Sequence, residues 1–329
     1  MAGAGRAIVG VVVAVAVALV LFIVVHGNGG SRPFGLPASA TPADKSAVAR
    51  GPASPGSPAG TAPAAAAAQV TSPVPATPAK AAPHASPLSG AASAYLAGRS
   101  GAVLAAVYDI KTGQSWRLGD GAAQDEASVV KLDVLETLLA RQGGGLLSPA
   151  DQVLAQSMIE DSDNDAATSL WNEDGGAAGL TYYGDRAGLT QTTPSECVAC
   201  AGFAFPGWGL STTVPQDQLT LLKQLVVPGQ DPLLSRAARS YALSLMEHVT
   251  ADQRWGISGG VPAGVTVALK NGWLPLDAAA TNWQVNSVGW VSGQGRDYLI
   301  VVLSTGNPTE QYGIDTINAL SSLVWAALR

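Results

Sequence analysis

Apolar positions are distributed very unevenly along the 329-residue chain. Residues 7–25 form one unbroken apolar run, whereas residues 26–90 are mostly Pro, Ala, Ser and Gly. From residue 91 to residue 329, apolar positions recur at the spacings of helices and strands. The pattern predicts a transmembrane segment over 1–25, a disordered linker over 26–90 and one globular domain over 91–329.

Within the globular part, periodicity predicts strands at both ends and helices between them. The expected strands are 103–108, 114–117, 265–269, 283–291 and 298–304. The expected helices are 128–141, 150–159, 166–171, 216–226, 235–249 and 310–328. This order favours an antiparallel sheet formed by the two ends of the domain, with a helical lobe inserted between them.

The apolar run at 7–25 is longer than the usual core of a cleaved signal peptide, which favours an uncleaved signal-anchor. No cysteine directly follows the run, so a lipoprotein anchor is not expected. Small residues at 38–40 leave cleavage, and therefore secretion, open. The few flanking charges do not set the orientation of the segment.

Charge and composition narrow the chemistry. The net charge is −6 and only 13% of residues are charged, so the chain lacks the basic surface that nucleic acids need. Three scattered histidines and two cysteines predict no metal site, and no cofactor is expected. A hydrolase or a binding protein that works without metal remains.

Ser128 and Lys131 are three residues apart in Ser-Val-Val-Lys and share one face of a predicted helix start. The free N–H groups of that helix end lie near the serine oxygen, and a buried lysine can accept the serine proton. Taken alone, the motif is more often a helix cap beside a solvated lysine.

Two further polar motifs follow. Ser162 and Asn164 stand in Ser-Asp-Asn between two predicted helices, where they offer a proton relay and an amide, or simply cap a helix. Lys270-Asn271-Gly272 ends a predicted edge strand, where the lysine would meet a carboxylate; a plain turn is the alternative.

The order of these three motifs resembles that of the penicillin-recognising serine enzymes, namely the class A β-lactamases and their D,D-peptidase relatives. The resemblance extends to segments 210–225, 246–273 and 297–308 and covers most of 91–329. It implies an α/β fold of the serine β-lactamase type, in which helices flank a five-stranded antiparallel sheet and a helical subdomain is added.

The resemblance also implies a role for each motif residue. Ser128 would be the acyl-accepting nucleophile, Lys131 would take or help to take its proton, and Ser162 would pass a proton to the leaving nitrogen. The backbone N–H groups of Ser128 and Trp273 would form the oxyanion hole, and Trp273 is the only tryptophan expected at the site. The substrate-binding residues would be Asn164, Lys270, Asn271 and Gly272.

The sequence departs from the family pattern at three places. Only 34 residues separate Ser128 from Ser162, which indicates a trimmed helical lobe. Asn271 replaces the usual Thr or Ser, whose hydroxyl meets the substrate carboxylate. The loop before Thr212 lacks the family's Glu–Asn pair for deacylation; its one carboxylate, Glu196, is either a solvated side chain or a displaced base. Cys197 and Cys200 in the same loop predict a small disulfide in an exported domain.

The sequence thus predicts a serine hydrolase that forms an acyl-enzyme on Ser128 and hydrolyses a β-lactam or a D-alanyl-D-alanine-like amide of peptidoglycan stem peptides. Such substrates lie outside the cytoplasm, so the expected location is the cell membrane, single-pass, with the domain on the extracytoplasmic side. Two alternatives stay open: a penicillin-binding D,D-peptidase with slow deacylation, and a catalytically idle domain that binds cell-wall peptide.

Overall fold

The computed structural model describes residues 85–143, 145–197, 199–200, 207–229 and 232–329. The predicted membrane segment and nearly all of the predicted linker lie outside these residues. Within the described ranges, none of the helices has the length and apolarity needed to cross a membrane.

A five-stranded antiparallel sheet forms the centre of the domain, as the sequence predicted. The strands occur in the order β2-β1-β7-β6-β5, and β1 from the start of the domain pairs with β7 from its end. Their bounds are β1 (Ala102–Asp109), β2 (Gln114–Leu118), β5 (Thr266–Pro275), β6 (Trp283–Gly293) and β7 (Arg296–Asn307). A separate short pair joins β3 (Gln124–Asp125) to β4 (Thr212–Thr213).

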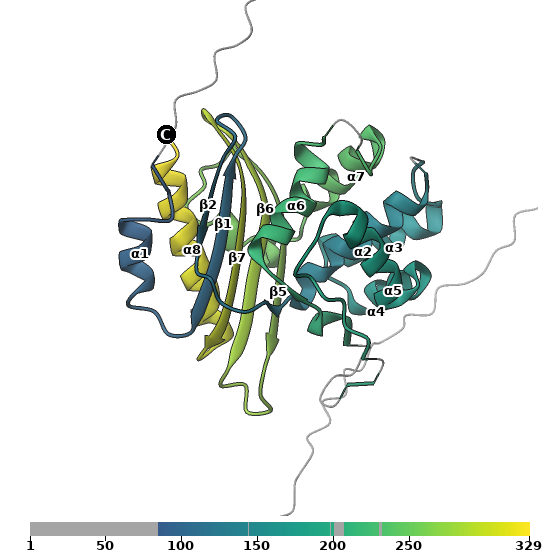
Figure 1. Ribbon diagram of the computed structural model, residues 1–329, viewed down its shortest axis with the longest axis horizontal. Coiled ribbons are helices and arrows are strands. Elements are labelled where there is room, and N and C mark those ends of the chain that lie inside the picture. The colour runs from purple at the N-terminus through teal and green to yellow at the C-terminus, as the bar shows by residue number, and fades with distance from the viewer. Residues whose placement is uncertain (1–84, 144, 198, 201–206, 230–231) are drawn as a thin grey trace, which may run out of the picture. The chain divides into compact units, whose positions relative to one another are not determined.

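Helices cover both faces of the sheet (Figure 1). The first face packs against α1 (Ala91–Leu96) and α8 (Glu310–Ala327). The helical lobe lies on the other face and contains α2 (Val130–Arg141), α3 (Pro149–Glu160), α4 (Asn164–Asp174), α5 (Gly176–Ala187), α6 (Pro215–Val226) and α7 (Arg236–Glu247).

The alternation of side chains along the strands divides the core into two layers. In β1, Ala105 and Val107 pack in the cluster beneath α8, while Leu104 and Ala106 pack in the cluster of the helical lobe. Because successive strand residues point to opposite faces, a central strand with both faces covered must be apolar throughout. The run Val103–Val107 meets that requirement.

A helix cap at Asp163 fixes the start of α4 and therefore the length of the loop between α3 and α4. The Asp163 side chain accepts a hydrogen bond from the N–H of Ala166 at 2.7 Å and so starts α4. Helix α3 ends at Glu160, so only three residues, 161–163, connect the two helices. The predicted position of Ser162 between two helices is confirmed.

Helices α1 and α5 were not predicted, and two of the predicted elements differ where they carry motif residues. Strand β5 does not end at Leu269 but continues to Pro275, because Asn271 and Gly272 pair with Ser287 and Asn286 of β6. The helix expected over 128–141 begins as a 3-10 turn, η1 (Ala127–Val129), before α2. The turn interpretation of Asn271-Gly272 is therefore wrong, and the edge-strand interpretation is confirmed.

Candidate active site

Ser128 lies in the 3-10 turn that leads into α2. Ala127 before it has a φ of 50°, a left-handed conformation that is uncommon for a residue with a Cβ. Such a conformation persists only where its surroundings hold it. Asn286 on β6 does so, donating from Nδ2 to the carbonyls of Asp125 at 2.8 Å and Glu126 at 3.0 Å. The turn that carries Ser128 is thus fixed to the sheet.

Gly272 brings edge strand β5 against the same turn. A Cβ at this position would lie 2.7 Å from the backbone N of Ser128 and from the carbonyl O of Glu126, closer than side-chain carbons come to such atoms. Only glycine fits there. The third motif is therefore brought directly beside the first one by backbone contact.

Lys131 is completely buried and points toward the second motif. Its Nζ donates to the Ser162 carbonyl, to Ser162 Oγ at 3.1 Å and to Asn164 Oδ1 at 2.8 Å. Burial lowers the pKa of Lys131 to about 7, and the nearby Asp163 carboxylate opposes part of that shift. No hydrogen bond between Lys131 and the Ser128 hydroxyl is present among the described residues. The amine is nonetheless suited to accept a proton near neutral pH.

Ser162 lies between two lysines. Its Oγ accepts hydrogen bonds from Lys131 Nζ at 3.1 Å and from Lys270 Nζ at 2.9 Å. Its φ of 58° is again left-handed, so the loop is held in a strained form. Burial, and after it the charge of Lys131, lowers the pKa of Lys270 well below its ordinary value. One hydroxyl thus joins the lysines of two separate motifs.

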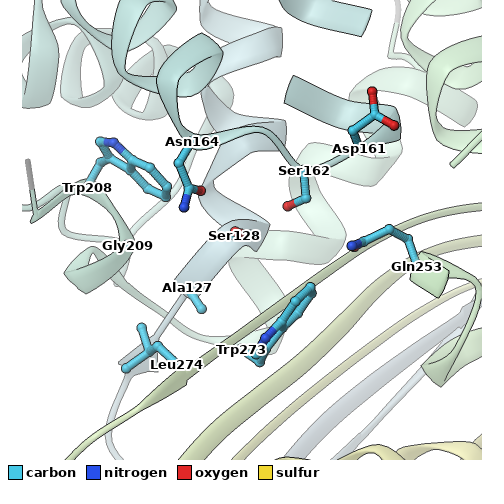
Figure 2. A pocket seen from close by; sticks show the side chains of 10 residues that line it. All are labelled: Ala127, Ser128, Asp161, Ser162, Asn164, Trp208, Gly209, Gln253, Trp273 and Leu274. Carbon is cyan, nitrogen blue, oxygen red and sulfur yellow. The ribbon is translucent and has the colours of Figure 1, made fainter. Parts of the chain in front are cut away.

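A cavity of about 200 Å³ opens beside these groups (Figure 2). Ser128 from the first motif and Ser162 and Asn164 from the second line it. Trp273, which directly follows the third motif, lines it too, but Lys270 and Gly272 do not. Trp273 stands on β5 across from Ser162. The other lining residues are Ala127, Asp161, Trp208, Gly209, Gln253 and Leu274.

Asn271 is not among the cavity-lining residues, contrary to its expected contact with substrate. It is 1% exposed, and its Nδ2 donates to the carbonyls of Gln253 at 2.7 Å and Trp255 at 3.2 Å. The reason is the two-residue period of a strand: Lys270 and Gly272 face the nucleophile turn, so Asn271 faces the other way.

Glu196 is exposed and lines a different cavity, of about 410 Å³, together with Trp171 and the α4–α5 junction. The structure therefore does not bring it to Ser128. Cys197 and Cys200 form a disulfide in the same loop.

Two tryptophans, rather than one, contact the site. Trp208, in the 3-10 turn η2 (Gly207–Leu210), is 2% exposed, and its ring centroid lies 5.0 Å from Lys131 Nζ. The expectation that Trp273 is the only tryptophan there is wrong. Asp161 and Gln253 were also missed, because neither stands inside a recognisable motif. The one available signal was their closeness in sequence to Ser162 and to the segment before β5.

A buried acidic cluster lies behind the nucleophile turn. Gln218 Nε2 donates to Glu126 Oε2 at 3.4 Å and to Asp133 Oδ1 at 3.3 Å. Burial raises the pKa of Asp133 to about 7, and burial together with Asp133 and Asp217 raises that of Glu126 well above its usual range. These carboxyls flank Ser128 in sequence, yet no motif marked them. They form a second buried polar layer beneath the site.

Solved structures with the same fold include class A β-lactamases. The extended spectrum β-lactamase TLA-1 is 18% identical with a TM-score of 0.60, and the match covers 72% of this chain and 96% of that one. A class A β-lactamase from Mycobacterium abscessus is 21% identical with a TM-score of 0.57, over 71% and 96% of the two chains. A mutant of PBP-A, solved as an acyl-enzyme complex with penicillin G, is 21% identical with a TM-score of 0.58, over 71% and 93%.

Sequence relatives and a family model also match this chain. The "Putative lipoprotein LppW" of Mycobacterium tuberculosis, and that of Mycobacterium bovis, are 32% identical to this chain over 206 residues. The match covers 60% of this chain and 62% of the length of those relatives. The family model described as "Beta-lactamase enzyme family" matches residues 151–328, just over half of the chain, and begins after Ser128. The chain therefore belongs to the β-lactamase enzyme family.

Proposed function

We propose that this protein forms an acyl-enzyme on Ser128 with a β-lactam or a D-alanyl-D-alanine-like amide. The observation that carries the proposal is that Ser162, which lines the same cavity as Ser128, accepts hydrogen bonds from two buried lysines, Lys131 and Lys270. Burying two amines is costly unless they are hydrogen-bonded, and proteins rarely place them together without a use.

The proposed reaction uses these groups in turn. Ser128 Oγ attacks the substrate carbonyl, and its proton passes to the neutral amine of Lys131. The backbone N–H groups of Ser128 and Trp273 stabilise the negative oxygen. As the carbon–nitrogen bond breaks, Ser162 gives its proton to the leaving nitrogen and is reprotonated by Lys131. Water then releases the acyl group from Ser128.

Slow deacylation is the outcome that the cavity lining favours for β-lactams. Asp161 is the only carboxylate residue among the lining residues, and its side chain points away from Ser128 in Figure 2. The indole of Trp208 lies over Lys131, and Glu196 lines another cavity. These positions favour a penicillin-binding D,D-peptidase over an efficient β-lactamase, because neither carboxylate is placed to activate water beside the acyl group.

The site of action follows from this substrate class. We place the domain on the extracytoplasmic side of the cell membrane, held by the apolar run at 7–25 acting as a single-pass anchor. The relatives named as lipoproteins support a membrane-associated location. Fractionation of cells that express the full chain, or the chain without residues 1–25, tests the anchor: only the full chain should sediment with membranes.

The decisive experiment is a time course of intact mass for the purified full chain with benzylpenicillin, beside Ser128→Ala. An adduct that persists for hours and is absent from the variant supports the D,D-peptidase proposal. A transient adduct on Ser128 identifies a β-lactamase instead. An acyl-D-alanyl-D-alanine peptide in the same assay should release D-alanine.

A catalytically idle peptide-binding domain is the second candidate. It is favoured by one observation, the absence of a hydrogen bond between the Ser128 hydroxyl and Lys131 in the described structure. This candidate predicts neither adduct nor D-alanine release, with retained binding of the peptide.

A further inference from the structure

We propose that Gln253 is a specificity-determining residue that binds the carboxylate on the leaving side of the substrate, and that Asn271 positions it. The inference rests on the proposed function for its substrate class. It assigns to Gln253 the contact that the family pattern would give to residue 271.

Gln253 presents an uncommitted amide to the cavity. It ends the 3-10 turn η3 (Ala251–Gln253), is 7% exposed and lines the same cavity as Ser128 and Ser162. In Figure 2 its side chain points into the cavity from the side of Ser162, opposite Trp208. Its Oε1 is buried without a hydrogen-bond partner, and its side chain makes no hydrogen bond within the described ranges.

A polar side chain without partners is unfavourable when buried, so it is seldom found without a ligand or another role. Figure 2 shows the nitrogen of the Gln253 amide at the cavity end of the side chain. Nε2 has two N–H donors, so it is Nε2, rather than the orphaned Oε1, that a ligand in the cavity would meet. The cavity side of this residue is therefore suited to an acceptor such as a carboxylate oxygen.

Asn271 holds the backbone that carries this amide. Its Nδ2 donates to the carbonyls of both Gln253 and Trp255, and the ring of Trp255 packs edge-on against Trp273 with centroids 5.7 Å apart. A threonine or serine hydroxyl has one proton and cannot donate to both carbonyls. Asn271 thus makes no contact with the substrate and instead holds the turn of Gln253 through two hydrogen bonds.

A lysine also lies behind this side of the cavity. Lys270 Nζ donates to Ser162 Oγ and to the carbonyl of Asn271; it does not line the cavity, so it acts on a ligand there through Ser162. No arginine lines the cavity among the described residues. Ser162 and Gln253 would together supply donors from a hydroxyl and an amide.

The test measures binding in the Ser128→Ala background, where no chemistry occurs. The ligands are an N-acyl-D-alanyl-D-alanine peptide and the same peptide with a C-terminal carboxamide, followed by calorimetry. We expect the parent to bind the acid more tightly than the carboxamide. Gln253→Ala should weaken binding of the acid about 10- to 100-fold and change that of the carboxamide less than about twofold. Gln253→Glu should weaken the acid further through like-charge repulsion.

Gln311→Glu is the matched control, since Gln311 is exposed on α8 and outside the cavity, and it should change neither affinity. Equal weakening of both ligands by Gln253→Ala, no effect on either, or no binding by the parent would overturn the proposal. If the preference for the acid holds while benzylpenicillin and the peptide fail to acylate the wild-type chain, the acyl-enzyme proposal falls and the carboxylate contact stands.

Asn271→Ala tests the positioning role. The Asn271→Ala variant should show the same reduced preference for the acid over the carboxamide as Gln253→Ala. The variant that carries both substitutions should show no further reduction. A purely structural role would lower the thermal midpoint and leave the preference for the acid unchanged.

Discussion

The two ends of the cavity differ in how much catalytic apparatus they carry. At one end Ser162 is hydrogen-bonded to two buried lysines, and the amide of Gln253 points inward. At the other end Trp208 and Gly209 present an indole ring and backbone. One end of the cavity therefore presents a hydroxyl and an amide, with two lysines behind the hydroxyl, whereas the opposite wall presents no carboxylate among the lining residues.

If the proposed function holds, acylation and deacylation depend on separate parts of the chain. The acylation end is made by helices and a strand whose backbones touch, as the contact of Gly272 with Ser128 shows. The opposite end comes from the 3-10 turn that follows a disulfide-bonded loop. A loop can change without disturbing the rigid elements beside it, so acylation can persist where deacylation is poor.

Of the changes considered, removal of the buried Lys131 amine should have the largest effect on the acylation rate. We expect Lys131→Met to lower the acylation rate with benzylpenicillin at least about 100-fold, because the Ser128 proton then has no acceptor nearby. Intact-mass kinetics at pH 8 measure the rate. Lys111→Met, at an exposed lysine that donates to the Gly295 carbonyl, is the control and should acylate normally. A Lys131 variant within tenfold of wild type would contradict a role as proton acceptor.

The pH profile should sharpen the same assignment. Lys131 can accept a proton only in its neutral form, and its pKa is about 7. The acylation rate should therefore rise about tenfold per pH unit below pH 7 and level off above it. A profile that stays flat from pH 5 to 9, or that rises only above pH 9, is incompatible with this role.

The acidic cluster behind the nucleophile should make stability depend on pH. Between pH 4 and 7 the unfolded chain has lost the Asp133 proton while the folded chain retains it, so folding binds a proton and stability falls as pH rises. Asp133→Asn removes this loss. Relative to wild type, its free energy of unfolding should increase from pH 4 to pH 8, by on the order of 4 kcal/mol at most.

Urea unfolding at pH 5 and pH 8 checks this expectation. The exposed Asp120→Asn variant serves as the control, and its difference from wild type should be the same at both pH values. A constant difference for Asp133→Asn as well would show that Asp133 is ionised in the folded chain.

The sequence predicted much of this architecture because its signals are local and periodic. The strands, the helices that begin near Asp163 and Ser235, and the three motifs were all predictable from short windows of sequence. The helix α5 was missed, because the glycines in Gly176–Ala187 weaken its helical pattern. Packing against α2, α4 and α6 stabilises it nevertheless.

The site was predictable only as far as motifs reached. The positions of Ser128, Ser162 and Lys270 followed from motif order. The direction of the Asn271 side chain depends on the alternation of side chains along β5, and the predicted strand ended at residue 269, before Asn271. Gln253 and Trp208 reach the cavity through tertiary contacts of irregular turns. Such contacts have no periodic signature in one sequence.

The smallest effect is expected for the loop carboxylate. We predict that Glu196→Gln leaves the lifetime of the penicillin adduct within about twofold of wild type, since Glu196 lines the cavity beside Trp171 rather than the one that holds Ser128. Intact-mass decay after removal of free penicillin measures the lifetime. A general base typically raises the rate of its step 10²- to 10⁴-fold, so loss of a true deacylation base would lengthen the adduct lifetime far beyond twofold. A lifetime lengthened tenfold or more would mean that the loop carries Glu196 across to the acyl group, and the two ends of the cavity would then share one complete apparatus.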